Sequence, residues 1–98
     1  MQTRDSMRRD AAESLAVQAL SFLAGDPERL ARFLALTGIG PDRIRAATAS
    51  PGFLAGVLDH LASEDALVTA FAAEAGIAPE EVEKARRVLG SGWERDSA

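Results

Sequence analysis

The sequence predicts an all-α protein, a compact bundle of about six short helices. Residues that begin helices recur along the chain, namely Asp or Ser before Pro and acidic residues in a first turn. Glycine follows several of the predicted helices, and no window alternates apolar and polar residues as a strand does. The helices expected from these signals cover residues 10–25, 26–38, 41–49, 50–62, 63–76 and 79–90.

The first two helices have clear starting signals. Asp10 followed by Glu13 is an acidic variant of the capping box, and the helix that it starts runs to Gly25. Asp26-Pro27 combines an N-cap residue with proline at the first helical position, and this helix ends at Gly38. The first helix is apolar nearly all round, so we expect it to be central or to present its extra apolar side to a partner.

The remaining helices start at prolines or at acidic clusters. Pro41 starts a short helix, and Ser50-Pro51 starts a longer one that should end near residue 62. Ser63 is expected to cap the fifth helix, because acidic residues that suit the positive end of the helix dipole follow it. Pro79 starts the sixth helix, which Gly90 is expected to end.

Length and composition restrict the organisation of the chain. Its 98 residues make one helical domain, expected at 10–90, between a disordered N-terminal tail at 1–9 and a C-terminal tail at 91–98. Trp93 in the second tail either docks on the bundle or stays free, and both alternatives remain open. No apolar run could span a membrane and no secretory signal begins the chain, so we expect a cytoplasmic protein.

No grouping of residues indicates catalysis or metal binding. The chain has no cysteine, and His60 is its only histidine. The spacing of His60 and Glu64 puts both side chains on one helix face, but a metal site needs three or four ligands. We therefore expect no enzymatic activity, no cofactor and no metal, with His60 flanking an apolar stripe.

The chain contains an internal repeat at an offset of 38 residues. Residues 33–47 lie over 71–85 without gaps, and both copies contain a Gly-Ile-x-Pro core. This match predicts two tandem three-helix units, at about 11–49 and 49–87. A structural repeat describes architecture and does not by itself indicate an activity.

The Gly-Ile element predicts the geometry of two helix ends. Gly38 and Gly76 stand where a helix commonly ends with a residue in the left-handed conformation, which glycine adopts without a Cβ penalty. The residue after such a glycine often packs back on the last turn. We therefore expect Ile39 and Ile77 to pack against the helices that precede them.

Surplus apolar residues suggest a binding surface for another protein or for a second copy of the chain. The candidate interaction surface consists of Val17, Phe22, Leu36 and Ile39. Two of these lie outside the main apolar stripe of the first helix, and Leu36 lies among arginines. The leading functional hypothesis is accordingly a non-catalytic protein–protein interaction module.

The alternative hypothesis is a nucleic-acid-associated protein with a helix-turn-helix-like corner. Arg43 and Arg45 on the third helix are the candidate contacts to nucleic acid. The formal net charge of −4 argues against nucleic acid as a partner, because phosphate contacts supply much of the affinity for it. The corner before the sixth helix is less suitable, since residues 80–83 include three glutamates.

Several short motifs are spread over most of the chain. They are Ala11-x-x-x-Leu15-Ala16, Phe22-Leu-Ala-x-Asp-Pro-Glu28, Arg32-Phe33-Leu34, Thr37-Gly38-Ile39, Pro51-x-Phe53-Leu54, Val57-Leu58-Asp59 and Pro79-Glu80-x-Val82. Together they resemble a family of short, all-helical alphaproteobacterial proteins known only as a domain of unknown function. The resemblance implies a helical fold, and it implies no activity and no site residues.

The three helices expected within residues 26–62 resemble, more loosely, a ubiquitin-associated domain. The resemblance implies a partner-binding patch made by the loop Thr37-Gly38-Ile39 together with Leu58 and Leu61. The loop departs from the usual pattern, which has methionine first and an aromatic residue third.

Overall fold

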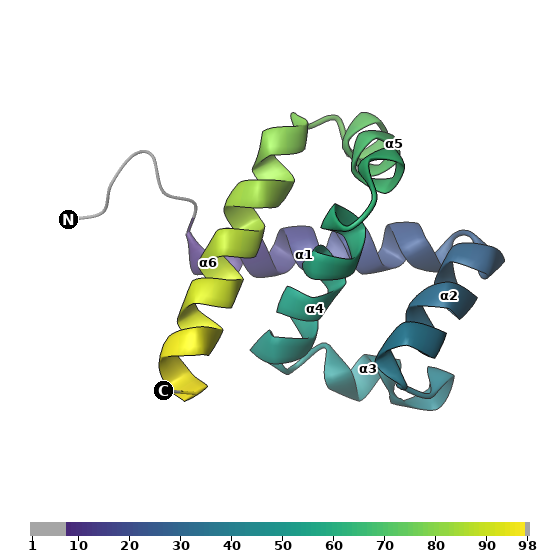
Figure 1. The fold of residues 1–98 in the computed structure, drawn as a ribbon, viewed down its shortest axis with the longest axis horizontal. Coiled ribbons are helices and arrows are strands. Elements are labelled where there is room, and N and C mark those ends of the chain that lie inside the picture. The colour runs from purple at the N-terminus through teal and green to yellow at the C-terminus, as the bar shows by residue number, and fades with distance from the viewer. Residues whose placement is uncertain (1–7, 98) are drawn as a thin grey trace.

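The computed structural model describes residues 8–97 and confirms the all-α fold (Figure 1). Its helical elements are α1 (Arg9–Ala24), α2 (Pro27–Thr37), the 3₁₀ turn η1 (Pro41–Arg43), α3 (Ile44–Ala47), α4 (Pro51–Ala62), α5 (Asp65–Ala75) and α6 (Pro79–Ser97). No strand occurs within this range. Most of the predicted N-terminal tail, residues 1–7, lies outside the described residues.

Helix α1 is the central helix of the bundle. It contacts α2, α4, α5 and α6, and Figure 1 shows α4 and α6 side by side, both crossing it. Ala12, Ala16 and Ala19 are fully buried along one side of α1. Such small side chains let a crossing helix approach closely, because interaxial distance depends on the side chains at the contact. The nearly all-apolar sequence of α1 is thus explained largely by burial between several helices.

Two of the predicted helix caps form as expected. The Asp26 carboxylate accepts hydrogen bonds from the backbone N–H groups of Glu28 (3.0 Å) and Arg29 (3.4 Å) at the start of α2. Ser50 Oγ accepts one from the N–H of Phe53 (3.4 Å) at the start of α4. These side chains satisfy amide groups that have no carbonyl partner within the helix.

Two other predicted caps are wrong. The N-cap of α1 is Arg8, and Asp10 lies inside the first turn, where its carboxylate accepts from the N–H of Ala11 (2.9 Å). The acidic group therefore still meets the positive end of α1, two residues after the cap. Ser63 ends α4 instead of starting α5, since its Oγ donates to the carbonyl of His60 (2.6 Å) and Glu64 is the N-cap of α5.

The third and sixth helices differ from the predicted ranges. The segment predicted as one helix at 41–49 divides into η1 and the single turn α3, which ends where Thr48 Oγ1 donates to the carbonyl of Arg45 (2.7 Å). Helix α6 continues past Gly90 to Ser97, so the predicted end at Gly90 is wrong. Gly90 does not adopt the left-handed conformation that would end a helix. The side chain of Trp93 lies outside the described residues.

The core joins apolar side chains from five helices. Those with almost no exposed area and the largest volume are Leu23, Phe33, Val57, Leu58, Leu61, Phe71, Val82 and Leu89. Phe33 of α2 meets two rings of α4 edge-on, with centroid distances of 5.9 Å to Phe53 and 5.2 Å to His60. The single large buried side chain of α2 thus fixes that helix against α4.

The left-handed glycine predicted from the repeat is confirmed at both corners. Gly38 and Gly76 have φ values of 76° and 72°, and they are the two positive-φ residues of the described chain. Phe33 and Phe71, which occupy equivalent positions, are both buried. At these two positions the Gly-Ile element of the sequence correctly predicted a left-handed glycine.

The two corners nevertheless end their helices differently. After Gly76, the N–H of Ile77 donates to the carbonyl of Ala72 (3.0 Å), as in a Schellman motif, and Ile77 packs on the core as predicted. After Gly38, the N–H of Ile39 instead donates to Thr37 Oγ1 (3.4 Å). Both isoleucines are half-buried, but Ile39 is not one of the side chains that pack on the core, and its packing on α2 stays a prediction. The third elements differ more, because α6 packs along α1 and α4 whereas α3 is one turn. Superposition of the two complete triplets stays a prediction.

Candidate functional site

A mostly apolar hollow lies between α1 and α5, with a volume of about 300 Å³. It is lined by Val17, Gln18, Ser21 and Phe22 from α1 and by Phe71, Glu74 and Ala75 from α5. The α1 residues are spaced one turn apart, which places them on one face of the helix. The hollow therefore brings together two of the predicted surface residues, Val17 and Phe22.

Three large side chains, together with Ala75, give this α1–α5 hollow its apolar surface. Phe71 is 2% exposed, and the ring of Phe22 meets it edge-on at a centroid distance of 5.5 Å. Phe22 is half-buried, whereas Val17 is 42% exposed. The hollow thus has a buried aromatic residue, a half-buried one and an exposed valine, arranged across two helices.

An arginine from α2 holds the ring of Phe22. The guanidinium carbon of Arg29 lies 4.7 Å from the centroid of that ring, and Arg29 Nε is 3.8 Å from a carboxylate oxygen of Asp26. A cation over an aromatic face at a partly exposed site contributes about 0.5–1 kcal/mol. Arg29 therefore has two favourable contacts within its own chain and helps to keep Phe22 in place.

The polar residues of the hollow have no such contacts. Within the described part of the chain, the side chains of Gln18, Ser21 and Glu74 form no hydrogen bond and no ion pair. Glu74 is exposed and is the one charged residue among those lining the hollow. The site accordingly combines apolar surface with a few free polar groups, as binding sites commonly do.

A second, larger hollow of about 590 Å³ lies at the corner between α2 and α3. It is lined by Gly38, Ile39, Gly40, Arg43, Ala46 and Ala47. The structure therefore places the predicted interaction residue Ile39 beside Arg43, one of the two predicted nucleic-acid contacts. Arg45 is exposed on α3 and does not line this hollow.

Leu36 stands apart from both hollows. It is 70% exposed on α2 and lines neither of them. The four predicted surface residues thus do not form one patch. Only Val17 and Phe22 share a concave site, which also includes Phe71 and Glu74 from a helix that the sequence did not connect with them.

The patch implied by the ubiquitin-associated resemblance is not formed. Leu58 and Leu61 are fully buried in the core, while Thr37 and Gly38 are exposed. α4 packs against α1, α5 and α6, and this packing covers the face that the resemblance would leave open. The two leucines are therefore core residues in this fold.

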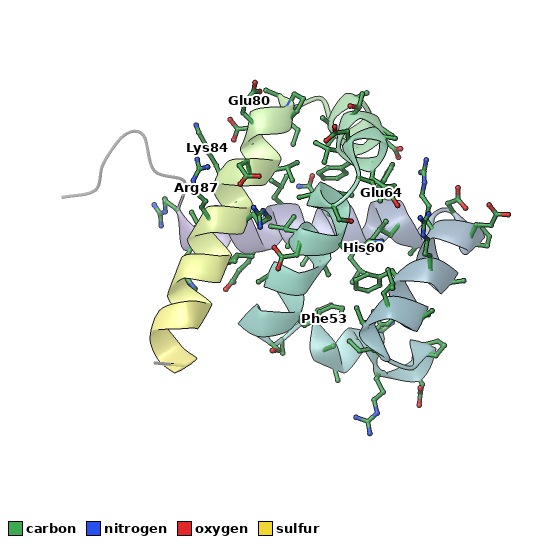
Figure 2. The ribbon with its side chains drawn as sticks, viewed as in Figure 1. Phe53, His60, Glu64, Glu80, Lys84 and Arg87 are labelled. Atoms are coloured by element: carbon green, nitrogen blue, oxygen red, sulfur yellow. The ribbon has the colours of Figure 1, made fainter. Side chains whose placement is uncertain are left out.

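His60 is a half-buried ring of the α2–α4 interface (Figure 2). Burial lowers the pKa of His60; the nearby carboxylate of Glu64 opposes this shift, and the guanidinium of Arg32 adds to it. Arg32 and Glu64 also form an ion pair of 2.7 Å between α2 and the start of α5. Within residues 8–97, no group of three or more metal-ligating side chains lies close enough to hold an ion.

Arg86 connects α6 to α4. Its guanidinium donates to Asp59 (3.0 Å) and to Glu83 (3.1 Å), and these bonds, the one to Glu83 first, raise the pKa of Arg86. Its Nε is buried and has no hydrogen-bond partner. This network joins two helices at their surface.

Neither helix corner has the form of a DNA-reading motif. The helix after the first corner, α3, is a single turn, which is short for a recognition helix. After the second corner, α6 carries Glu80, Lys84 and Arg87 along one outer edge, a face of mixed charge (Figure 2). Within the described residues, no helix is both long enough and apolar enough to cross a membrane.

Comparison with protein-family models matches residues 9–92 to one family, described as "Protein of unknown function (DUF3572)". The match covers all the helices described above except the last residues of α6. No curated protein and no solved structure matched the chain.

Proposed function

Because the chain belongs to the DUF3572 family of proteins of unknown function, we propose its role from its surface: it is a non-catalytic module that binds another protein through the α1–α5 hollow. The observation that carries this proposal is the exposure of Val17, at 42%, at a concave apolar site. Apolar area removed from water stabilises a complex by about 25 cal/mol per Å² before the costs of association. A concave site allows a partner side chain to lose water on several sides at once.

A paired substitution tests this proposal. Val17→Asp places a charge in the hollow, and Leu36→Asp places the same charge on an apolar residue outside it. Both side chains are exposed, so both variants should fold, which thermal unfolding checks. In affinity capture from the native cell, we expect the wild-type chain and Leu36→Asp to retain the same partner and Val17→Asp to lose it. Equal retention by all three chains would contradict the proposed site.

Self-association is the alternative use of the same surface. Sedimentation at increasing protein concentration distinguishes the two, because we expect the wild-type chain to remain a monomer. A dimer that Val17→Asp dissociates would replace the proposed partner with a second copy of the chain.

A nucleic-acid role has less support. Arg43 and Arg45 are exposed and have no ion pair within the described residues, but they lie in η1 and in the single-turn α3. A gel-shift experiment at about 50 mM salt decides the matter, since phosphate contacts would make binding strongly salt-dependent. Binding that is lost in the double variant Arg43→Ala, Arg45→Ala would favour this role over the proposed one.

A further inference from the structure

We infer that the α1–α5 hollow receives a basic amphipathic helix, with an apolar side chain of that helix beside Val17 and a lysine or arginine paired with Glu74. The inference rests on the proposed function and names the chemistry of the partner. The inference is based on the negative charge of Glu74 at the hollow, on the lack of an ion-pair partner for Glu74 within the described residues, and on the shape of the site.

The charge at the hollow favours a cation. Glu74 is the one charged residue that lines it, and within the described residues Glu74 has no ion-pair partner. Arg29, whose guanidinium lies over the ring of Phe22, does not line the hollow and already contacts Asp26. The formal net charge of the whole chain, −4, has the same sign as Glu74 and favours approach of a basic partner.

The shape of the hollow favours a helix. The site lies between two helices, which is the arrangement in which an amphipathic helix lays its apolar face into a groove. Its volume of about 300 Å³ is at the lower end of the range for ligand pockets and suits individual side chains. Side chains three or four positions apart lie on one face of a helix. The expected partner sequence therefore has Leu, Ile, Met or Phe three or four residues from Lys or Arg.

A displayed library of helical peptides, selected on the immobilised wild-type chain, provides the probe. We expect selected peptides to combine an apolar residue with Lys or Arg at that spacing. The best peptide is then titrated by fluorescence anisotropy against the variants. Glu74→Gln should weaken binding about two- to fivefold at low salt, the range for an exposed ion pair, and the difference should shrink at high salt. The matched control Glu80→Gln, an exposed glutamate outside the hollow, should leave affinity unchanged.

A charge exchange gives the sharpest result. Glu74→Lys should weaken binding of the basic peptide. A peptide in which Glu replaces the Lys or Arg should regain affinity for the Glu74→Lys variant but not for the wild-type chain. If Glu74→Gln and Glu74→Lys bind the basic peptide as well as the wild type, or if the selected peptides carry no excess of cations, the inference is wrong. In that case loss of binding in Val17→Asp would leave the proposed function standing. If no peptide is selected, the inference fails, and affinity capture with Val17→Asp and Leu36→Asp still tests the proposed function. If Val17→Asp binds the selected peptide unchanged, the hollow is not the binding site and both ideas fail.

Discussion

Phe33 provides the most direct test of how α2 is held in the bundle. The side chain is fully buried and meets the rings of Phe53 and His60 at 5.9 and 5.2 Å. Phe33→Ala removes a whole ring, including two aromatic contacts, and leaves a cavity. Substitutions of this kind cost about 3–5 kcal/mol. Since small domains have a total stability of about 5–15 kcal/mol, the variant should be close to unfolding at physiological temperature.

The assay is urea unfolding followed by far-ultraviolet circular dichroism. Phe33→Leu keeps most of the side-chain volume and should lose less than about half as much, so the series remains measurable if Phe33→Ala does not fold. Leu36→Ala is the matched control on the same helix, because Leu36 is 70% exposed and its truncation should change stability by less than about 0.5 kcal/mol. A loss below about 1 kcal/mol in Phe33→Ala would show that α2 is not held by this ring.

Three further predictions test other parts of the fold. Gly38→Ala should lower the free energy of unfolding in urea by about 1–2 kcal/mol, because the backbone φ of Gly38 is +76°. The control Gly56→Ala, inside α4 where an added Cβ would meet no atom, should raise it by about 0.5–1 kcal/mol. Equal effects of the two substitutions would contradict the left-handed conformation of Gly38. Burial lowers the pKa of His60 below 6.5, so the unfolded chain binds more protons and stability should fall as pH decreases through 6.5 toward the folded pKa. His60→Gln should remove that part of the pH dependence, and a pH profile that this substitution leaves unchanged would show that His60 is not its source. Arg86→Ala should cost up to about 1 kcal/mol, and Arg87→Ala close to none, because Arg87 is more exposed and its one ion pair is 3.9 Å long; the reverse order of melting temperatures would be the contrary result.

Four helix boundaries were predictable because a single residue decides each of them locally. Asp26 and Ser50 accept hydrogen bonds from the amides of the next turn, and Gly38 and Gly76 adopt a conformation that other residues avoid. Gly90 also follows a predicted helix, but it lies inside α6 and does not adopt the left-handed conformation. The helix can continue through it because a glycine in a helix interior costs only about 1 kcal/mol. Neighbouring residues therefore do not determine whether such a glycine ends its helix.

The candidate site was predictable on one helix only. Val17 and Phe22 fall outside the main apolar stripe of α1, so the sequence marks them as unusual. Phe71 belongs to the ordinary apolar stripe of α5, and Glu74 lies on an ordinary exposed face. Their meeting with α1 depends on the angle at which α5 crosses it. Packing along the whole bundle sets that angle, and it has no local sequence signal.

The central position of α1 also affects how the protein is made. Its buried side chains include Ala12, Leu15, Ala16 and Leu23, and the helix packs above all against α6 and α4, which follow much later in the chain. During synthesis α1 leaves the ribosome before the other described helices, and the chain must grow to residue 97 before α6 is complete. At about 5–20 residues per second this interval lasts on the order of 4–15 s. Until α6 is complete, α1 lacks one of its two main neighbours, and the part of its apolar surface that α6 covers stays in contact with water.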